Sequence, residues 1–168
     1  MITLDYNLNV SEVDRLKEID WRNVDEADLD YYMFKGDIRF RVDKANFDAE
    51  WGWVTILDFA TQIFEIVAEL KGVGVFTFTE SDAGIQFKRQ SDIVVISSNY
   101  SEDEGIVDYE ELFTSVSVFF RRVLTDLEKL FPELRQNVNF LSRIQMLKGH
   151  GDFEDLDSWR AVWKTEKF

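Results

Sequence analysis

Hydrophobic and polar residues alternate without a break over the first ten positions of the chain. The apolar positions are Ile2, Leu4, Tyr6, Leu8 and Val10. Successive side chains of a strand point to opposite faces of a sheet, so this pattern predicts a strand with one buried and one solvated face. Residues 11–20 are expected to form a short helix, because Ser11 and Asp14 have the spacing of a capping box.

Two further alternations, out of phase with each other, follow in residues 25–42. Their apolar positions are Leu29, Tyr31 and Met33 in the first and Ile38, Phe40 and Val42 in the second. A slip of one residue exchanges the two faces of a strand, so the phase change at Lys35 and Gly36 indicates a bulge or a tight hairpin. We interpret the segment as one strand with a bulge at Gly36. The aromatic residues 46–53 after it are expected to form a loop.

Three longer segments have the three- and four-residue apolar spacing of helices that face a core. They are residues 53–72, 109–131 and 133–149. Gly72 is expected to cap the end of the first, Asp108 the start of the second, and Pro132 to open the third, which Gly149 closes.

Between the first two helices, residues 73–98 predict a meander. Three short apolar alternations are separated by the turn segments 80–84 and 89–92. Connections this short require antiparallel pairing. The acidic residues 100–105 are expected to form a loop after the last strand.

The order of these elements predicts an α+β fold. We expect a mainly antiparallel sheet of about five strands, with the long helices packed on one of its faces. The 168 residues contain no linker rich in glycine, serine or proline and no internal repeat, which predicts a single domain over residues 1–168.

The charge balance excludes several classes of partner. There are 19 lysine and arginine residues against 33 aspartate and glutamate residues, a formal net charge of −14. Such a chain repels nucleic-acid phosphates, so no nucleic-acid partner is expected. The acidic N-terminal segment is unlike a signal peptide and no long uncharged apolar segment occurs, so we expect a cytoplasmic protein without a membrane partner.

Catalytic motifs and cofactor motifs are absent from the sequence. There is no cysteine, His150 is the only histidine, and no glycine-rich phosphate-binding motif or EF-hand pattern occurs. We therefore expect no catalytic residue, no cofactor and no metal site, and a protein that is not an enzyme. The alternative is an enzyme that uses carboxylates, with or without Mg²⁺, which would need a pocket where at least two acids converge.

The candidate functional residues are acids in the predicted loops, one tryptophan in the aromatic segment 46–53, and two tryptophans four residues apart near the C-terminus. They are Glu80, Asp82, Glu102, Asp103, Glu104, Asp108, Trp51, Trp159 and Trp163. Acidic loops at a shared edge of an antiparallel sheet would attract a basic protein, and tryptophan is enriched at the centres of interfaces. The competing interpretation assigns the acids to solubility and the tryptophans to the core.

Several segments of the sequence also resemble a known layout. "GDIRFRV", "WGWVTILDFATQIFEIVAEL", "IVVIS" and "FTSVSVFFRRVLTDLEKLFPEL" follow one another over residues 34–146 as in small, acidic, uncharacterised bacterial proteins that are similar to immunity proteins of polymorphic toxin systems. This resemblance lies in the pattern of elements and carries no catalytic residue. It implies a non-enzymatic, protein-binding module that inhibits a basic toxin by covering it. A further alternative is a structural or regulatory homodimer formed through an open sheet edge or the C-terminal tryptophans.

Overall fold

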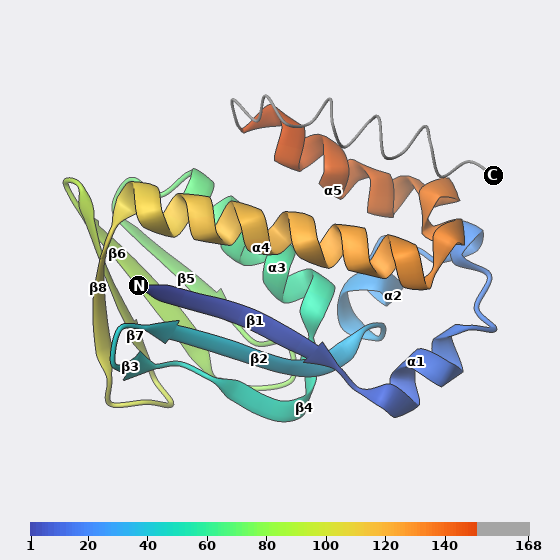
Figure 1. Ribbon diagram of the computed structural model, residues 1–168, viewed down its shortest axis with the longest axis horizontal. Coiled ribbons are helices and arrows are strands. Elements are labelled where there is room, and N and C mark those ends of the chain that lie inside the picture. The colour runs from blue at the N-terminus through green and yellow to red at the C-terminus, as the bar shows by residue number, and fades with distance from the viewer. Residues whose placement is uncertain (151–168) are drawn as a thin grey trace.

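The computed structural model describes residues 1–150, which form two antiparallel sheets and five α-helices. Sheet A contains β1 (Ile2–Leu8), β2 (Lys35–Val42), β3 (Ala45–Asn46) and β4 (Ala49–Thr55). β2 lies at its centre, with β1 along one side and with β3 and β4 along the other (Figure 1). The pairing of β1 with β2 runs from Ile2 opposite Val42 to Leu8 opposite Gly36.

Sheet B is a meander of four strands. It contains β5 (Val73–Thr77), β6 (Gly84–Gln90), β7 (Ile93–Ser98) and β8 (Glu104–Asp108), each paired with the next. Its inner face carries the buried residues Phe76, Ile85, Phe87, Val94, Ile96 and Val107. The strand alternation therefore works as the sequence predicts, with one face in the core and one face in solvent.

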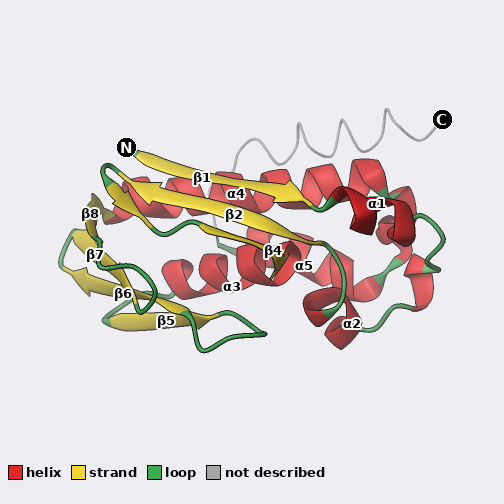
Figure 2. Cartoon of the chain, turned by 90° about the horizontal axis from the view of Figure 1, so that it is seen from below, coloured by secondary structure: helices red, strands yellow, loops and turns green. Residues whose placement is uncertain are grey.

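Helices α3 (Ile56–Ala68) and α4 (Tyr109–Leu130) pack against each other in the middle of the molecule (Figure 2). α3 also contacts β2 and β5, and α4 contacts β1 and β8. The shorter α1 (Val10–Leu16), α2 (Glu26–Tyr31) and α5 (Val138–Gly149) gather near the C-terminal half of α4 (Figure 1). No helix in residues 1–150 is long and apolar enough to cross a membrane.

Aromatic side chains join these layers into one core. The ring of Phe40 on β2 stacks on that of Phe87 on β6, with centroids 6.3 Å apart. The ring of Phe59 on α3 meets Phe76 of β5 edge-on at 5.0 Å and Phe119 of α4 edge-on at 6.1 Å. Both sheets and both central helices thus bury their apolar faces against shared residues.

The α+β class is confirmed, but the sheet differs from the expected one of about five strands. Eight strands form two sheets, because the expected loops at 46–53 and 100–105 contain strand residues. In β8, Gly105 and Val107 point inward while Ile106 is 56 % exposed. Five residues that begin with acid give too short an alternation to recognise in the sequence.

The expected strand at residues 25–34 is wrong. Residues 26–31 form α2, because the side chain of Asp25 accepts a hydrogen bond from the backbone N–H of Asp28 at 2.8 Å and caps the helix. A helix of six residues buries only Leu29, so the sequence contains no helical repeat to contradict the apparent alternation.

The irregularity expected at Gly36 is present, but the extra residues lie on the neighbouring strand. Gly36 pairs with Val54 and Ile38 with Ala49, so β4 carries the additional residues. Gly52 among them has φ = +75°, a conformation that favours glycine, and its backbone N–H donates to Asp37 Oδ1 at 2.7 Å.

Expectations for the helix ends are confirmed in part. The side chain of Asp108 accepts hydrogen bonds from the N–H groups of Glu110 and Glu111 and caps α4. Pro132 opens a 3₁₀ helix, Pro132–Gln136, before α5. By contrast, Asn9 rather than Ser11 caps α1, and α3 ends before Gly72, with Glu69 as its C-cap.

Gly36 provides a test of the close pairing between β1 and β2. A Cβ atom at this position would overlap the backbone carbonyl of Asn7. We expect Gly36→Ala to lower the free energy of unfolding by about 3 kcal/mol, at the upper end of the usual cost of overpacking. Chemical denaturation measures this change.

Gly72→Ala is the matched control, because no atom lies within 4 Å of a Cβ there. Its effect should stay within about 0.5 kcal/mol. Equal stability of the two variants would contradict the register of β1 against β2.

Candidate protein-binding surface

The two connections at one end of sheet B lie side by side. The β5–β6 connection carries Glu80 and Asp82, and the β7–β8 connection carries Glu102 and Asp103. Asn99 links them, because its side-chain oxygen accepts from the N–H of Gly84 at 2.8 Å and its amide group donates to the carbonyl of Asp82 at 2.7 Å. The antiparallel meander thus gathers acids that are distant in the sequence.

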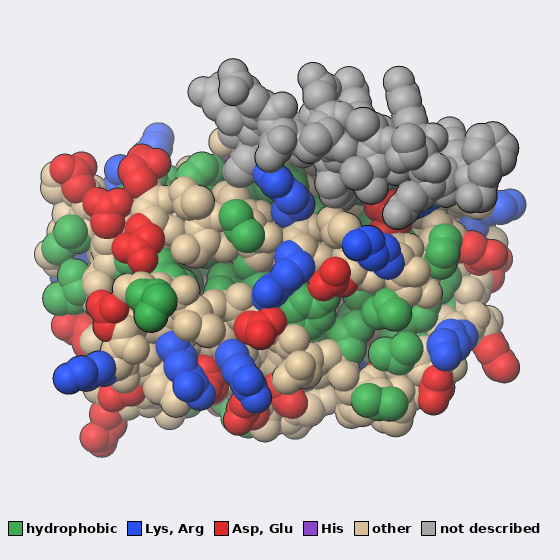
Figure 3. Space-filling view, viewed as in Figure 1, with side chains coloured by type: hydrophobic (Ala, Val, Ile, Leu, Met, Phe, Trp, Pro, Cys, Tyr) green, Lys and Arg blue, Asp and Glu red, His purple; other side chains and the backbone are tan. Residues whose placement is uncertain are grey.

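We call this end the acidic end of sheet B, defined by Glu80, Asp82, Glu102, Asp103 and Glu104. All five residues are exposed. Within residues 1–150, Glu80, Asp82, Glu102 and Glu104 form no ion pair with lysine or arginine. Their negative charge therefore remains available to a partner. Figure 3 shows acidic side chains along the whole side of the molecule where sheet B lies, most of them in the view near the start of α4.

Asp103 has a structural contact as well. Its Oδ2 accepts a hydrogen bond from the backbone N–H of Asn46 on β3 at 2.8 Å. This bond ties the β7–β8 connection of sheet B to sheet A. The acidic end is consequently held in place by the junction between the two sheets.

Asp108 does not belong to the acidic end. It closes β8 at the opposite end of sheet B and caps α4, which satisfies the exposed N–H groups of that helix. Trp159 and Trp163 lie outside the described residues 1–150.

Trp51 lies next to the acidic end, in an aromatic cluster with Trp53, Phe78 and Tyr100. The ring of Trp51 stacks on that of Trp53 at 5.0 Å and meets Phe78 and Tyr100 edge-on at 4.9 and 5.2 Å. Trp51 and Trp53 are two residues apart on β4, which is the spacing of neighbours on one face of a strand. Trp51 is half-buried, so it both packs between the sheets and reaches the surface.

A hollow of about 500 Å³ adjoins this cluster. It is lined by Arg41, Asn46, Asp48, Glu50, Trp51, Tyr100, Ser101 and Asp103. Asp48 binds Arg41 across it at 2.5 Å, and Glu50 binds Arg39 at 3.1 Å. The Tyr100 hydroxyl donates to the carbonyl of Phe47 at 2.8 Å, and burial raises the pKa of Tyr100 above its ordinary value. The tyrosine is therefore a fixed, neutral wall of the hollow.

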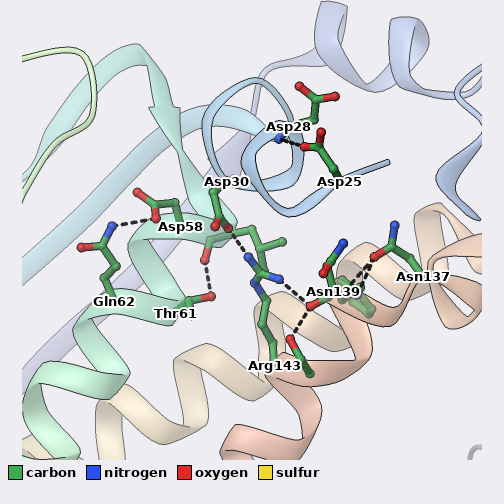
Figure 4. Close-up of polar contacts among 12 residues, drawn as sticks. Asp25, Asp28, Asp30, Asp58, Thr61, Gln62, Asn137, Asn139 and Arg143 are labelled. Atoms are coloured by element: carbon green, nitrogen blue, oxygen red, sulfur yellow. Dashed lines mark hydrogen bonds and ion pairs between the residues drawn. The ribbon is translucent and has the colours of Figure 1, made fainter. Parts of the chain in front are cut away.

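A second group of charged residues lies inside the molecule, and sequence reasoning missed it (Figure 4). Arg143 on α5 is buried, forms an ion pair with Asp30 on α2, and donates to the carbonyl of Asn139 at 2.5 Å. Asp58, in the first turn of α3, is buried and accepts hydrogen bonds from Gln62 at 2.7 Å and Thr79 at 3.2 Å. The only sequence signal was an acid among the apolar residues of α3.

Burial dominates the titration of these acids. Desolvation raises the pKa of Asp58 and of Asp30 above the usual range, and the nearby charge of Arg143 opposes this shift at both. Neither acid lines the hollow beside Trp51, and the described residues contain no group of acids and histidines suited to a metal ion. The ion pair of Arg143 with Asp30 connects α5 to α2, whereas Asp58 is held by Gln62 of its own helix and by Thr79 after β5.

Comparisons with known proteins add no relative. No family model matches the chain, and neither the curated proteins nor the solved structures contain a match. Function must therefore be argued from the geometry of the described surface.

Asp58 provides a test of the buried charges. Its pKa is higher in the folded chain than in the unfolded chain, so the folded state holds the proton more tightly. Ionisation then lowers the free energy of unfolding as the pH rises from the ordinary value of 3.8 through the raised pKa. We expect Asp58→Asn to flatten this decline and to be more stable than the wild type at neutral pH.

Denaturant titrations across the acidic to neutral range measure both effects. Asp14→Asn, at an exposed position on α1, is the control and should change the free energy of unfolding at neutral pH by no more than about 0.5 kcal/mol. A loss of stability in Asp58→Asn at neutral pH would show instead that the ionised carboxylate is favourable where it lies.

Proposed function

We propose that the protein is a non-enzymatic binding module, an inhibitor similar to an immunity protein, which covers a basic partner such as a toxin with the acidic end of sheet B. One observation carries the proposal: four exposed carboxylates at one end of sheet B form no ion pair with lysine or arginine within residues 1–150. Asp103 of the acidic end also lines the hollow beside Trp51, so these acids adjoin an aromatic surface.

The charge distribution supports rapid association. The chain carries a net charge of −14, and the four exposed acids at this end of sheet B add to it without an ion pair to lysine or arginine within residues 1–150. A field of this kind accelerates encounter with a basic protein and weakens as salt screens it. The acidic end would thus set the orientation of the first encounter.

The hollow beside Trp51 supports a longer residence time. Aromatic side chains in a partly buried setting act as anchors at the centre of interfaces, and charged residues around them control the rate of encounter. Because Trp51 and Tyr100 are fixed by ring contacts and by the Phe47 carbonyl, little side-chain order is lost on binding. Inhibition would follow from coverage of the partner's surface.

The decisive experiment reverses the charge of the acidic end. Wild-type chain immobilised at low salt should capture a basic protein from the source cell. The triple variant Glu80→Lys, Glu102→Lys and Glu104→Lys should associate with that protein at least about tenfold more slowly, because electrostatic steering is lost. Surface plasmon resonance measures the rate, and circular dichroism checks the fold.

The matched control changes the net charge equally at the other end of the molecule. Asp14→Lys, Glu18→Lys and Glu133→Lys alter three exposed acids, on α1, in the turn after α1 and on the 3₁₀ helix before α5. This control should keep most of the association rate. Equal association rates for the two triple variants would show that the acidic end acts only through net charge. Unchanged binding by the variant of Glu80, Glu102 and Glu104 would exclude the acidic end as the contact surface.

A further inference from the structure

β5 is an outer strand of sheet B, and its outer edge is uncovered. It pairs with β6 alone. Helix α3 packs on its inner face, where a Cβ atom at Gly74 would meet the side chains of Ile66 and Leu70. In Figure 2, β5 lies at the margin of the molecule, and no helix or strand lies beyond it.

A hydrogen bond at the end of β5 shows which backbone groups point outward. The N–H of Phe78 donates to the carbonyl of Ala83 at 2.9 Å, so the even-numbered residues of β5 face β6. The N–H and carbonyl groups of Val73, Val75 and Thr77 therefore point to the open edge. No loop or side chain within residues 1–150 forms a hydrogen bond with these groups.

Side chains cover the outer edges of two other strands but not that of β5. Arg122 of α4 donates to the carbonyl of Leu4 on β1, and Asp103 accepts from the N–H of Asn46 on β3. The sequence of β5, VGVFT, contains no charge and no proline, and its pairing with β6 runs without a bulge. Proteins usually protect an exposed edge with one of these devices, so an unprotected edge is a template for a further strand.

The side chains on the outer face of β5 make this edge apolar. Val73 and Val75 are 58 % and 55 % exposed. A hollow of about 310 Å³ adjoins Val75, Thr77 and Asp82 on the same face. A docked strand would bury the two valines and place its own side chains beside this hollow.

The charges at the two ends of β5 show which strand fits the edge. Lys71 precedes the strand and Lys88 lies opposite Val73 on β6, whereas Asp82 lies in the turn after the other end. All three charged residues are exposed, and none forms an ion pair within residues 1–150. When two such strands pair antiparallel, the basic end of each lies beside the acidic end of the other. The edge is thus complementary to itself, as contact across a twofold axis requires.

We infer that the outer edge of β5 is a docking surface for β5 of a second copy of this chain, which pairs with it antiparallel across a twofold axis at Val75. Val75 lies in the middle of β5, so this axis pairs every outward-facing residue of the strand. Val75 then lies opposite its counterpart, and Val73 lies opposite Thr77 of the other copy. Each of these pairs exchanges two backbone hydrogen bonds, and Lys71 of each copy lies beside Asp82 of the other.

This inference is independent of the proposed function. β8 is the far strand of sheet B, three strands away from the dimer edge. Glu102 and Glu104 lie in β8 and in the connection before it, so they remain free for a basic partner.

Sedimentation equilibrium tests the dimer at physiological ionic strength, where salt screens the repulsion between two acidic chains. The wild type should show a reversible monomer–dimer equilibrium between micromolar and millimolar concentrations. Val75→Lys should weaken the dimer at least about tenfold, because it places two like charges opposite each other at the axis. Circular dichroism checks that the variant is folded.

Ile106→Lys is the matched control. Ile106 is 56 % exposed, nearly the same as Val75, and it lies on the outer face of sheet B but on the far strand β8. This variant adds the same charge and should dimerise as the wild type does. Equal weakening by both variants would contradict the β5 edge as the contact.

Exchange of the two charges tests the antiparallel arrangement. Lys71→Glu and Asp82→Lys should each weaken the dimer, because each places like charges side by side. The double variant should recover most of the wild-type affinity. Further weakening in the double variant would contradict a contact between Lys71 of one copy and Asp82 of the other.

Amide hydrogen exchange identifies the strand used. The N–H groups of Val73, Val75 and Thr77 should exchange more slowly as the wild-type concentration rises, whereas those of Gly74 and Phe76, which face β6, should not change. A dimer that leaves the three outward amides unprotected overturns the inference. So does a wild type that stays monomeric at millimolar concentration, and protection of these amides by the captured basic protein would then assign the edge to that partner.

Discussion

Phe40 of β2 and Phe87 of β6 stack at the junction of two small sheets, and the remaining structure depends on this shared burial. A sheet of four strands with one apolar face cannot exist alone in water, because that face must be covered. Here each sheet covers part of the other, and α3 and α4 fill the remaining space. The junction thereby fixes where the connections of sheet B emerge and which side chains they carry into solvent.

The same junction explains why aromatic and acidic residues meet at one place. Gly105 of β8 packs so closely on Val42 of β2 that a side chain there would collide with it. Beside this contact, Asp103 binds the backbone of β3 and Tyr100 binds the carbonyl of Phe47. The polar groups needed to close the junction hold the neighbouring acids outward, so the proposed binding surface arises from the packing of the core. On the other side of sheet A, α4 runs along β1, and Arg122 of α4 donates to the carbonyl of Leu4.

Periodicity predicted the parts of the fold that repeat over many residues. β1, the first three strands of sheet B and the helices α3, α4 and α5 follow from spacing alone, and the antiparallel meander implied that some acidic connections share an edge. α2 was not predictable, since one buried leucine gives no repeat. β4 was hidden because the bulge around Gly52 breaks its alternation. The pairing of Arg143 with Asp30 joins residues 113 positions apart, and no local pattern announces such a partner.

Amide hydrogen exchange of the unperturbed protein tests the shared core most directly. If the two sheets depend on one another, the slowest amides of β2 in sheet A and of β6 and β7 in sheet B should open with the same free energy, equal to that of global unfolding. Denaturant should affect both sets with the same slope. Exchange of sheet B through a separate opening of lower free energy would contradict the account, because the acidic end would then not be held by the packing of the whole molecule.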